Sequence, residues 1–253
     1  MKVRIDRLLV DRGLVPSRER AQALVIAGKV LVNEQKVVKS GAPVPDDAAI
    51  RLLGNDLPYV SRGGLKLERA LEHWRLQVDG RICLDVGAST GGFTDCLLQH
   101  GAARVIAVDT GYGQIDMKLR NDLRVALLEK TNARYLEPAQ LAPLLAGADI
   151  SFFAMDVSFI SATLVLPAVL GSIDMPCEGV ILVKPQFEVG RENVGKGGIV
   201  RDPDAQAEAV RTVRQAVIDL GATFTDVTDS PILGAEGNRE FLLYARFEKQ
   251  LTE

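Results

Sequence analysis

The sequence contains few of the residues that build metal centres and disulfide frameworks. Its 253 residues include only three cysteines and two histidines. Cys83, Cys96 and Cys177 are widely spaced and form no paired motif. This spacing argues against a zinc site or a disulfide framework and is typical of a reducing compartment. We therefore expect no metal centre.

Long apolar runs are also missing. The longest stretch without a charged residue, Val157 to Ile173, contains Pro167 and several hydroxyl side chains. A membrane-spanning helix needs about 20 mostly apolar residues, so we interpret this stretch as protein core. No basic segment followed by an apolar one opens the chain, which predicts no signal peptide, a cytoplasmic location and no membrane partner.

Charge is present but unevenly distributed. The formal net charge of the whole chain is −3. Residues 1–75 contain 14 Lys and Arg against 9 Asp and Glu, a net charge of +5, which leaves −8 for the remainder. A basic N-terminal region joined to an acidic body suggests that the N-terminal region contacts a polyanion.

A strand, a glycine turn and a helix are predicted in close succession at residues 82–100. Residues 82–86 are mostly apolar and indicate a buried strand, three glycines within 87–92 predict a tight turn, and residues 93–100 indicate a helix. Residues 104–109 predict the next strand, which ends in Asp109. This order begins a βαβ unit, which binds ligands at the carboxyl ends of its strands.

The spacing of the glycines distinguishes between two ligands. Dinucleotide-binding loops need G-x-G-x-x-G so that the backbone can approach a pyrophosphate. Here the spacing is G-x-x-x-G-G, Ser89 replaces the second glycine, and Asp85 precedes the loop. A carboxylate suits the ammonium of an amino-acid tail, so we favour S-adenosylmethionine over NAD. The expected cofactor-binding residues are Asp85, Gly87, Ala88, Ser89, Thr90, Gly91, Gly92, Phe93, Asp109 (ribose diol), Asn132 (adenine edge) and Asp156.

Residues 4–53 indicate a separate small domain. Helical spacing of apolar residues predicts one helix ending at Gly13 and another from Ser17 to Gly28, and residues 29–33 and 36–38 predict a β-ribbon. Prolines and glycines at 43–58 indicate a linker near 54–60 and hence domains at 1–58 and 59–253. The string Ala-Gly-Lys-Val-Leu-Val-Asn at 27–33 resembles the S4 RNA-binding domain, although Glu34 replaces its usual glycine.

The S4 resemblance implies that the basic residues of the small domain bind RNA. A helical hairpin with ordinary solvated charges is the alternative interpretation. Further basic residues stand at the start of the second domain and in a glycine-rich segment, 190–202, which predicts either a lid that grips a phosphate backbone through Arg191, Lys196 and Arg201 or a mobile linker. The candidate RNA-binding residues are Arg4, Arg7, Arg18, Arg20, Lys29, Arg62, Lys196 and Arg201.

The rest of the chain supplies further strands and helices. Strands are predicted at 125–128, 150–156, 179–184, 223–228 and 240–247, and helices at 65–74 and 203–220. Asp156 and Lys184 end their strands and should lie at the edge that holds the glycine loop. Cys177 follows Pro176, as in cytosine-C5 transferases, but it precedes its strand, which argues against a thiolate nucleophile.

Two aromatic features near this edge are less decisive. Tyr112, in a loop at 110–114 that we expect to be flexible, either lies against a ligand base or is a surface aromatic. No proline-rich aromatic clamp of the kind used by amino-group methyltransferases follows Asp156. Its absence disfavours a base amine as the methylated group.

Four residues complete the pattern: Lys66, Asp156, Lys184 and Glu240. Lys, Asp, Lys and Glu in this order match the tetrad of FtsJ-like ribose 2′-O-methyltransferases. Longer strings match one family, namely Tyr-Val-Ser-Arg-Gly-Gly (59–64), Asp-Val-Gly-Ala-Ser-Thr-Gly-Gly-Phe-Thr-Asp (85–95), Asp-Val-Ser-Phe-Ile-Ser (156–161), Lys-Pro-Gln-Phe-Glu (184–188) and Gly-Lys-Gly-Gly-Ile-Val-Arg (195–201). Together with the S4-like domain, they resemble the TlyA family of ribosomal RNA 2′-O-methyltransferases, also labelled haemolysin A.

The resemblance implies an α/β fold, namely a class I S-adenosylmethionine-dependent methyltransferase with a Rossmann-like seven-stranded sheet, and a small N-terminal α+β S4-like domain. It implies 2′-O-methylation of a cytidine in ribosomal RNA. We expect the large subunit rather than the small one, because few residues precede Arg4. Lys184 is then the candidate base, Lys66 a second cation, Asp156 the residue that fixes the lysine, and Glu240 a partner of Lys66 or of the ribose.

Other functions remain as alternatives at this point. A non-catalytic ribosome-assembly factor would keep the fold for RNA binding alone, and a membrane-active haemolysin would need a membrane-binding segment that we do not find. An NAD-dependent oxidoreductase is disfavoured by the loop spacing. We expect the protein to be a monomer with ribosomal RNA or a ribosomal subunit as its partner.

Overall fold

The computed structural model describes residues 2–15, 17–53, 57–145 and 147–249. The chain divides into two compact units, 1–58 and 59–253. Part of the linker expected at 54–60 lies outside the described residues. Each unit has its own apolar core, and we describe each by itself.

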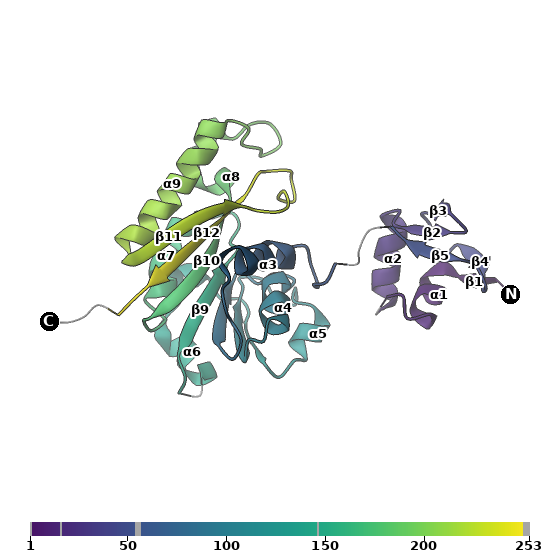
Figure 1. Cartoon of the computed structure of the whole chain (residues 1–253), viewed down its shortest axis with the longest axis horizontal. Coiled ribbons are helices and arrows are strands. Elements are labelled where there is room, and N and C mark those ends of the chain that lie inside the picture. Colours follow the sequence, from purple (N-terminus) through teal and green to yellow (C-terminus); the bar gives the residue numbers. More distant parts are fainter. Residues whose placement is uncertain (1, 16, 54–56, 146, 250–253) are drawn as a thin grey trace. The chain divides into compact units, whose positions relative to one another are not determined.

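The first unit packs two short helices against small antiparallel sheets (Figure 1). Ser17 caps the second helix by accepting a hydrogen bond from the Arg20 amide, as its place in the sequence predicts. The short strands at both ends of the unit escaped prediction because three residues are too few to show a period. The elements are β1 (Lys2–Arg4), α1 (Ile5–Asp11), α2 (Arg18–Ile26), β2 (Val30–Val32), β3 (Gln35–Val37), β4 (Pro43–Pro45) and β5 (Ile50–Leu52).

The hairpin between β2 and β3 tolerates the residue that replaces glycine. Asn33 and Glu34 both adopt positive φ, at 50° and 63°, which a two-residue hairpin turn requires. Glu34 is held in this unusual conformation beside Arg51 of β5, whose Nε donates to it over 3.0 Å. The turn expected from the S4 pattern therefore forms in spite of the substitution.

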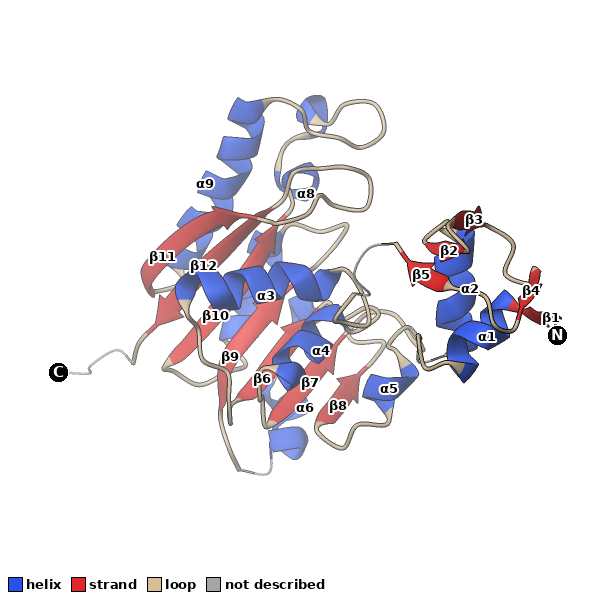
Figure 2. Cartoon of the chain, turned by 45° about the vertical axis from the view of Figure 1, so that its right-hand side comes forward, coloured by secondary structure: helices blue, strands red, loops and turns tan. Residues whose placement is uncertain are grey.

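The second unit is a seven-stranded sheet between two layers of helices (Figure 2). The strand order is β11-β12-β10-β9-β6-β7-β8, in which the five strands from β10 to β8 are parallel and β12 is antiparallel to both neighbours. The strands are β6 (Ile82–Val86), β7 (Arg104–Val108), β8 (Val125–Leu128), β9 (Ile150–Met155), β10 (Cys177–Val183), β11 (Ala222–Asp229) and β12 (Phe241–Phe247).

Helices cover both faces of this sheet. Helices α3, α4 and α5 pack on one face and α6, α7 and α9 on the other, as two separate apolar clusters show. Successive residues of one strand enter opposite clusters, Cys83 one and Leu84 the other. The helices are α3 (Gly63–Trp74), α4 (Gly92–Gln99), α5 (Met117–Arg120), α6 (Pro138–Leu145), α7 (Leu166–Leu170), α8 (Pro185–Glu188) and α9 (Pro203–Asp219), with 3₁₀ turns η1 (Ala133–Tyr135), η2 (Ala162–Leu164) and η3 (Arg191–Asn193).

The sheet confirms the predicted strands, with one correction. Cys177 does not precede β10 but is its first residue, because the strand begins two residues earlier than predicted. The buried thiol still lies at the amino end of β10, opposite the end that carries Lys184. Burial raises the pKa of the Cys177 thiol to about 12, so it does not form a nucleophilic thiolate near neutral pH.

The sheet has a topological switch between β6 and β9. From β6 the chain proceeds outward through β7 and β8, then returns to the other side of β6 to form β9 and β10. Ligands of open α/β sheets bind at the carboxyl ends of strands where the order reverses in this way. Among the described residues, no helix is long and apolar enough to cross a membrane.

Candidate functional site

The glycine loop joins β6 to α4 at the switch point. Its residues Gly87 and Ser89 have positive φ, at 87° and 49°. Gly87 is required for a second reason, because a methyl group there would overlap the backbone oxygen of Asp156, which follows β9. The loop and Asp156 are therefore in direct backbone contact.

A second close approach brings α3 to the same loop. A methyl group on Gly92, the first residue of α4, would lie 2.9 Å from the amide nitrogen of Gly64 at the start of α3. The missing side chain of Gly92 therefore lets the two helix ends meet closely, whereas a methyl group on Gly64 would overlap the ring of Tyr59. Lys66 lies on the first turn of α3, next to this contact.

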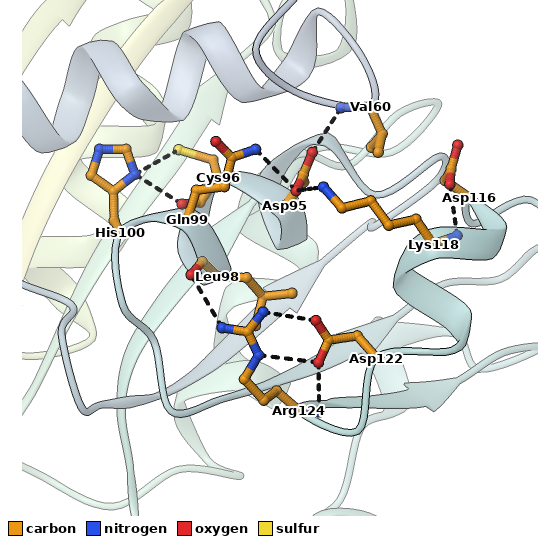
Figure 3. Close-up of polar contacts among 10 residues, drawn as sticks. All are labelled: Val60, Asp95, Cys96, Leu98, Gln99, His100, Asp116, Lys118, Asp122 and Arg124. Atoms are coloured by element: carbon orange, nitrogen blue, oxygen red, sulfur yellow. Dashed lines mark hydrogen bonds and ion pairs between the residues drawn. The ribbon is translucent and has the colours of Figure 1, made fainter. Parts of the chain in front are cut away.

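Asp95 anchors the segment that enters α3 (Figure 3). This carboxylate is almost fully buried in the first turn of α4 and accepts a hydrogen bond from the Val60 amide over 2.9 Å. Gln99 and Lys118 also donate to it, over 3.1 and 3.2 Å. The entry to α3 and helix α5 are thus both tied to the helix that follows the glycine loop.

Asp109 is oriented by the backbone at the end of β7. Its two carboxylate oxygens accept hydrogen bonds from the amides of Ser89, over 2.8 Å, and Gly111, over 2.6 Å. Asp109 also lines a cavity of about 300 Å³. The two backbone hydrogen bonds therefore fix this carboxylate at the wall of the cavity, and its contact with a ribose diol stays a prediction.

Asp85 lies deeper than the sequence suggests. Its side chain is fully buried behind the loop and lines neither of the two cavities described below. Thr94 donates to one carboxylate oxygen over 2.6 Å, and the other oxygen has no hydrogen-bond partner among the described residues. Burial raises its pKa to about 7, with further repulsion from Asp156 and Asp109.

Two cavities meet at the switch point. The first, of about 280 Å³, is lined by the residues of the predicted tetrad, by Arg62 and by the start of α4. The second, of about 300 Å³, contains Asp109 and Asn132. Both are lined by Gly87, Ser89 and Asp156, so they share a boundary. Of the predicted loop residues, Ala88, Thr90, Gly92 and Phe93 line the first cavity and Gly91 lines neither.

The four tetrad residues form two ion pairs in the first cavity. Lys66 Nζ lies 2.5 Å from Glu240 Oε2, and Lys184 Nζ lies 2.6 Å from Asp156 Oδ1. Lys184 also donates to Ser158 Oγ over 2.7 Å. Lys66, Lys184 and Glu240 are all buried, with exposed fractions of 8%, 8% and 3%. Lysines are rarely buried unless they are paired, and both of these lysines are paired with a carboxylate at the wall of the cavity.

An aromatic pair beside the tetrad escaped prediction. Phe159 is 91% exposed, has a φ of 64° and lines the second cavity. Its ring lies 5.4 Å from that of Phe187 in α8, and Glu188 accepts hydrogen bonds from Ser161 and Ala162 that hold the two loops together. This ring pair is not the proline-rich aromatic clamp that the sequence lacks, and its signal in the sequence is an aromatic residue three positions after Asp156.

The glycine-rich segment 190–202, which lies between α8 and α9 (Figure 1), is hydrogen-bonded to the loop before Glu240. Asn238 is buried and bonds this segment twice, accepting from the Val200 amide over 2.9 Å and donating to the Gly198 oxygen over 2.8 Å. Lys196 and Arg201 lie exposed on the segment. The interpretation as a mobile linker does not account for this buried connection.

Two further candidates have mixed outcomes. Asn132 lines the second cavity, but its side-chain oxygen also accepts from the Arg134 amide and caps η1. Tyr112 lines neither cavity, is 69% exposed, and lies under Lys130, whose Nζ is 4.6 Å from the ring centre. Its position favours the interpretation as a surface aromatic.

The basic residues of the first unit lie on its surface in different environments. Lys29 is exposed, and Arg7 forms an exposed pair with Asp11. Arg20 lies in the first turn of α2. Arg4 and Arg18 both contact the buried Asp6.

Comparisons with known proteins agree with this geometry. A model of the FtsJ-like methyltransferases matches residues 59–247, and a model of the S4 domain matches residues 3–50. The chain is 45% identical over 246 residues to the 16S/23S rRNA (cytidine-2′-O)-methyltransferase TlyA of Mycobacterium tuberculosis, covering 97% of this chain and 90% of that protein. It is 35% identical to the 23S rRNA (cytidine-2′-O)-methyltransferase TlyA of Campylobacter jejuni, over 74% of this chain and 70% of the relative.

A structural relative gives the same result. A protein described as a hemolysin from Streptococcus thermophilus superposes with a TM-score of 0.74 at 43% identity, covering 98% of this chain and 89% of that one. The Brachyspira hyodysenteriae protein named Hemolysin A is 40% identical, over 96% of this chain and 99% of its own length. The chain therefore belongs to the TlyA family, in which an S4 domain precedes an FtsJ-like methyltransferase domain.

Proposed function

We propose that this protein transfers a methyl group from S-adenosylmethionine to the 2′-hydroxyl of a cytidine in ribosomal RNA of the large subunit. The proposal rests on one observation: two buried ion pairs, Lys66–Glu240 and Lys184–Asp156, lie in a cavity that borders the glycine loop. The two relatives named as TlyA methyltransferases have 23S RNA as their shared substrate, which supports the large subunit.

The residues at the switch point fit S-adenosylmethionine better than a dinucleotide. Asp156 lines both cavities and Asp109 lines the second, and these two carboxylates would repel a pyrophosphate. The same two carboxylates favour a ligand that carries a sulfonium and an ammonium. Asp109 would hold the ribose diol, and Asn132 would contact the adenine. When bound, S-adenosylmethionine supplies an electrophilic methyl group on a positively charged sulfur.

Lys184 is the proposed base. A ribose hydroxyl must lose its proton as its oxygen attacks the methyl group. Lys184 can accept that proton once its ammonium, which pairs with Asp156, has released a proton to solvent and become a neutral amine. Asp156 lies 2.6 Å from Lys184 Nζ, so the resulting ammonium is paired as it forms. Ser158 fixes the direction of the amine from the other side.

Lys66 and Glu240 are proposed to orient the ribose. Their buried ion pair lines the same cavity, and each side chain is held by the other. Holding two reactants in the correct geometry can lower a barrier by several kcal/mol without any change in acidity. Arg62, exposed at the rim of this cavity, is placed to contact a phosphate next to the target nucleotide.

Phe159 is proposed to support the base of the target nucleotide. An aromatic ring exposed to solvent stacks readily on an unpaired base, with a contribution of about 1–3 kcal/mol. Its contact with Phe187 and its position three residues after Asp156 hold the ring beside the reacting groups. The S4 domain and the segment 190–202 would supply contacts with the RNA backbone through their basic side chains.

Methyl transfer to purified RNA tests the proposal. The protein is incubated with tritiated S-adenosylmethionine and unmodified 23S or 16S transcripts, and primer extension locates the methylated ribose. We expect incorporation at a cytidine of 23S RNA. Incorporation into 16S RNA alone would contradict the preferred subunit, and RNA binding without any methyl transfer would indicate an assembly factor.

Lys184→Ala tests the assignment of the base. We expect it to abolish methyl transfer while cofactor affinity, measured by calorimetry, stays unchanged. Lys249→Ala, which removes an exposed lysine far along the chain, serves as the control. Methyl transfer by Lys184→Ala would refute the assignment. Lysis of red cells by the wild-type protein would support the haemolysin alternative instead.

A further inference from the structure

The first unit buries one carboxylate beneath two arginines. Asp6 has an exposed fraction of 0%. Arg4 donates to both of its oxygens, through Nε over 3.0 Å and Nη2 over 2.9 Å, and Arg18 Nε donates over 3.1 Å. Gln22 Nε2 adds a fourth hydrogen bond over 3.0 Å. Oδ2 thus accepts three of these hydrogen bonds and Oδ1 accepts one.

The three charged residues come from different segments. Arg4 ends β1, Asp6 lies in the first turn of α1, and Arg18 begins α2. The hydrogen bonds from Arg4, Gln22 and Arg18 hold the pKa of Asp6 well below its usual range. The carboxylate thus stays charged near neutral pH and connects two surface arginines across the unit.

The arginines themselves remain open to solvent. The Arg4 and Arg18 side chains are 51% and 55% exposed, although both contact a fully buried partner. The Arg4 guanidinium also lies flat against Gly41, where a methyl group would stand 3.1–3.2 Å from three of its atoms. Both guanidinium groups are therefore fixed at the surface instead of moving freely.

We propose that Asp6 is a positioning residue that fixes Arg4 and Arg18 as a two-armed receptor for an RNA phosphodiester. Guanidinium groups bind phosphate oxygens through paired N–H bonds, and their affinity rises when the groups are already oriented. This inference rests on the proposed function in one respect, namely that RNA is the substrate. It assigns to the buried acid a role in binding a polyanion, although its own charge opposes that binding.

If Asp6 has this role, its substitution should change RNA affinity in the direction opposite to the one that net charge alone predicts. Asp6→Asn removes one negative charge from a basic surface, which alone should strengthen RNA binding. If Asp6 orients the arginines, the substitution weakens binding instead. Asp11→Asn provides the matched control, because it makes the same charge change on the same helix at an exposed site.

The test measures filter binding of an unmodified 23S ribosomal RNA transcript to full-length protein over a series of KCl concentrations. We expect Asp6→Asn to weaken binding by about tenfold or more and to lower the salt slope by roughly 1–2, the equivalent of one or two lost phosphate contacts. Asp11→Asn should bind as tightly as wild type or slightly more tightly, with an unchanged slope. Affinity for S-adenosylmethionine should be the same in all three proteins.

A second pair of variants tests the inference even if Asp6→Asn does not fold. Arg4→Lys and Arg18→Lys keep Asp6 and the net charge but remove the planar fork, and we expect each to weaken RNA binding about threefold to tenfold. Circular dichroism melting reports whether the variants are folded. If Asp6→Asn unfolds, the lysine variants decide the question.

The outcomes separate this inference from the function on which it rests. Asp6→Asn binding RNA as tightly as wild type, or both lysine variants binding normally, would overturn the inference. Methyl transfer by the wild-type protein to the same transcript is measured in parallel. If the wild-type protein methylates the transcript but the variants bind RNA as tightly as wild type, only the inference about Asp6 is overturned. If the wild-type protein neither binds nor methylates RNA, both the inference and the proposed function are overturned.

Discussion

Replacing Asp85 by asparagine should change the pH dependence of stability. The Asp85 carboxyl is fully buried, has one oxygen without a partner among the described residues, and has a pKa raised to about 7. In the unfolded chain the same group titrates near 3.8. Between these two pH values the folded protein binds the additional proton, so the contribution of this group to the free energy of unfolding falls as pH rises.

The magnitude follows from the interval between the two pKa values. Each pH unit within the interval corresponds to about 1.4 kcal/mol, so the loss between pH 5 and pH 7 is roughly 3 kcal/mol and changes little above pH 7. Asparagine does not titrate and lacks this loss. The stability of Asp85→Asn relative to wild type should therefore be about 3 kcal/mol more favourable at pH 8 than at pH 5.

Urea unfolding of both proteins at pH 5 and pH 8 measures this double difference. The packing cost of the substitution is present at both pH values and cancels. Thr94→Val, which removes the hydrogen bond to Asp85, should raise the carboxyl pKa further and enlarge the pH effect. Equal differences between wild type and Asp85→Asn at the two pH values would refute the reasoning.

Three other changes test the site. Gly87→Ala should destabilise the protein by about 1–3 kcal/mol more than Gly80→Ala, which thermal melting of the two variants measures. Both residues have positive φ, but only Gly87 lies against a backbone oxygen. Phe159→Ala should reduce kcat/KM for RNA about tenfold without lowering the melting temperature, whereas Phe159→Tyr should have the kcat/KM of wild type. A fully active alanine variant would contradict the stacking role. Asn238→Asp loses the donor to the Gly198 oxygen, so trypsin should cleave at Lys196 sooner, whereas unchanged cleavage would show that the segment is held by other contacts.

The strands and the tetrad were predictable because they follow simple periodic rules. Parallel strands buried on both faces form continuous apolar runs, which identified β6, β7 and β9 within about two residues. The carboxyl ends of such strands share one edge, and this rule predicts that Asp156 and Lys184 lie close together. Ser17 was identified as a cap from its residue type and position.

Features that depend on contacts between distant segments could not be predicted in this way. The burial of Asp6 requires β1, α1 and α2 to meet, and no local pattern distinguishes it from an exposed acid. Asp85 was expected to reach the ligand, but its depth depends on the packing of α4 over β6. Phe159 stands in a turn, where an exposed aromatic residue has no periodic signature.

The backbone contact between Gly87 and Asp156 has a consequence for exchanging parts between related enzymes. The two residues belong to segments nearly 70 positions apart, yet neither loop can shift without displacing the other. A chimaera that receives a foreign cofactor loop would therefore also need the matching turn after β9. Segments 85–93 and 156–161 should therefore be exchanged together, although they lie far apart in the sequence.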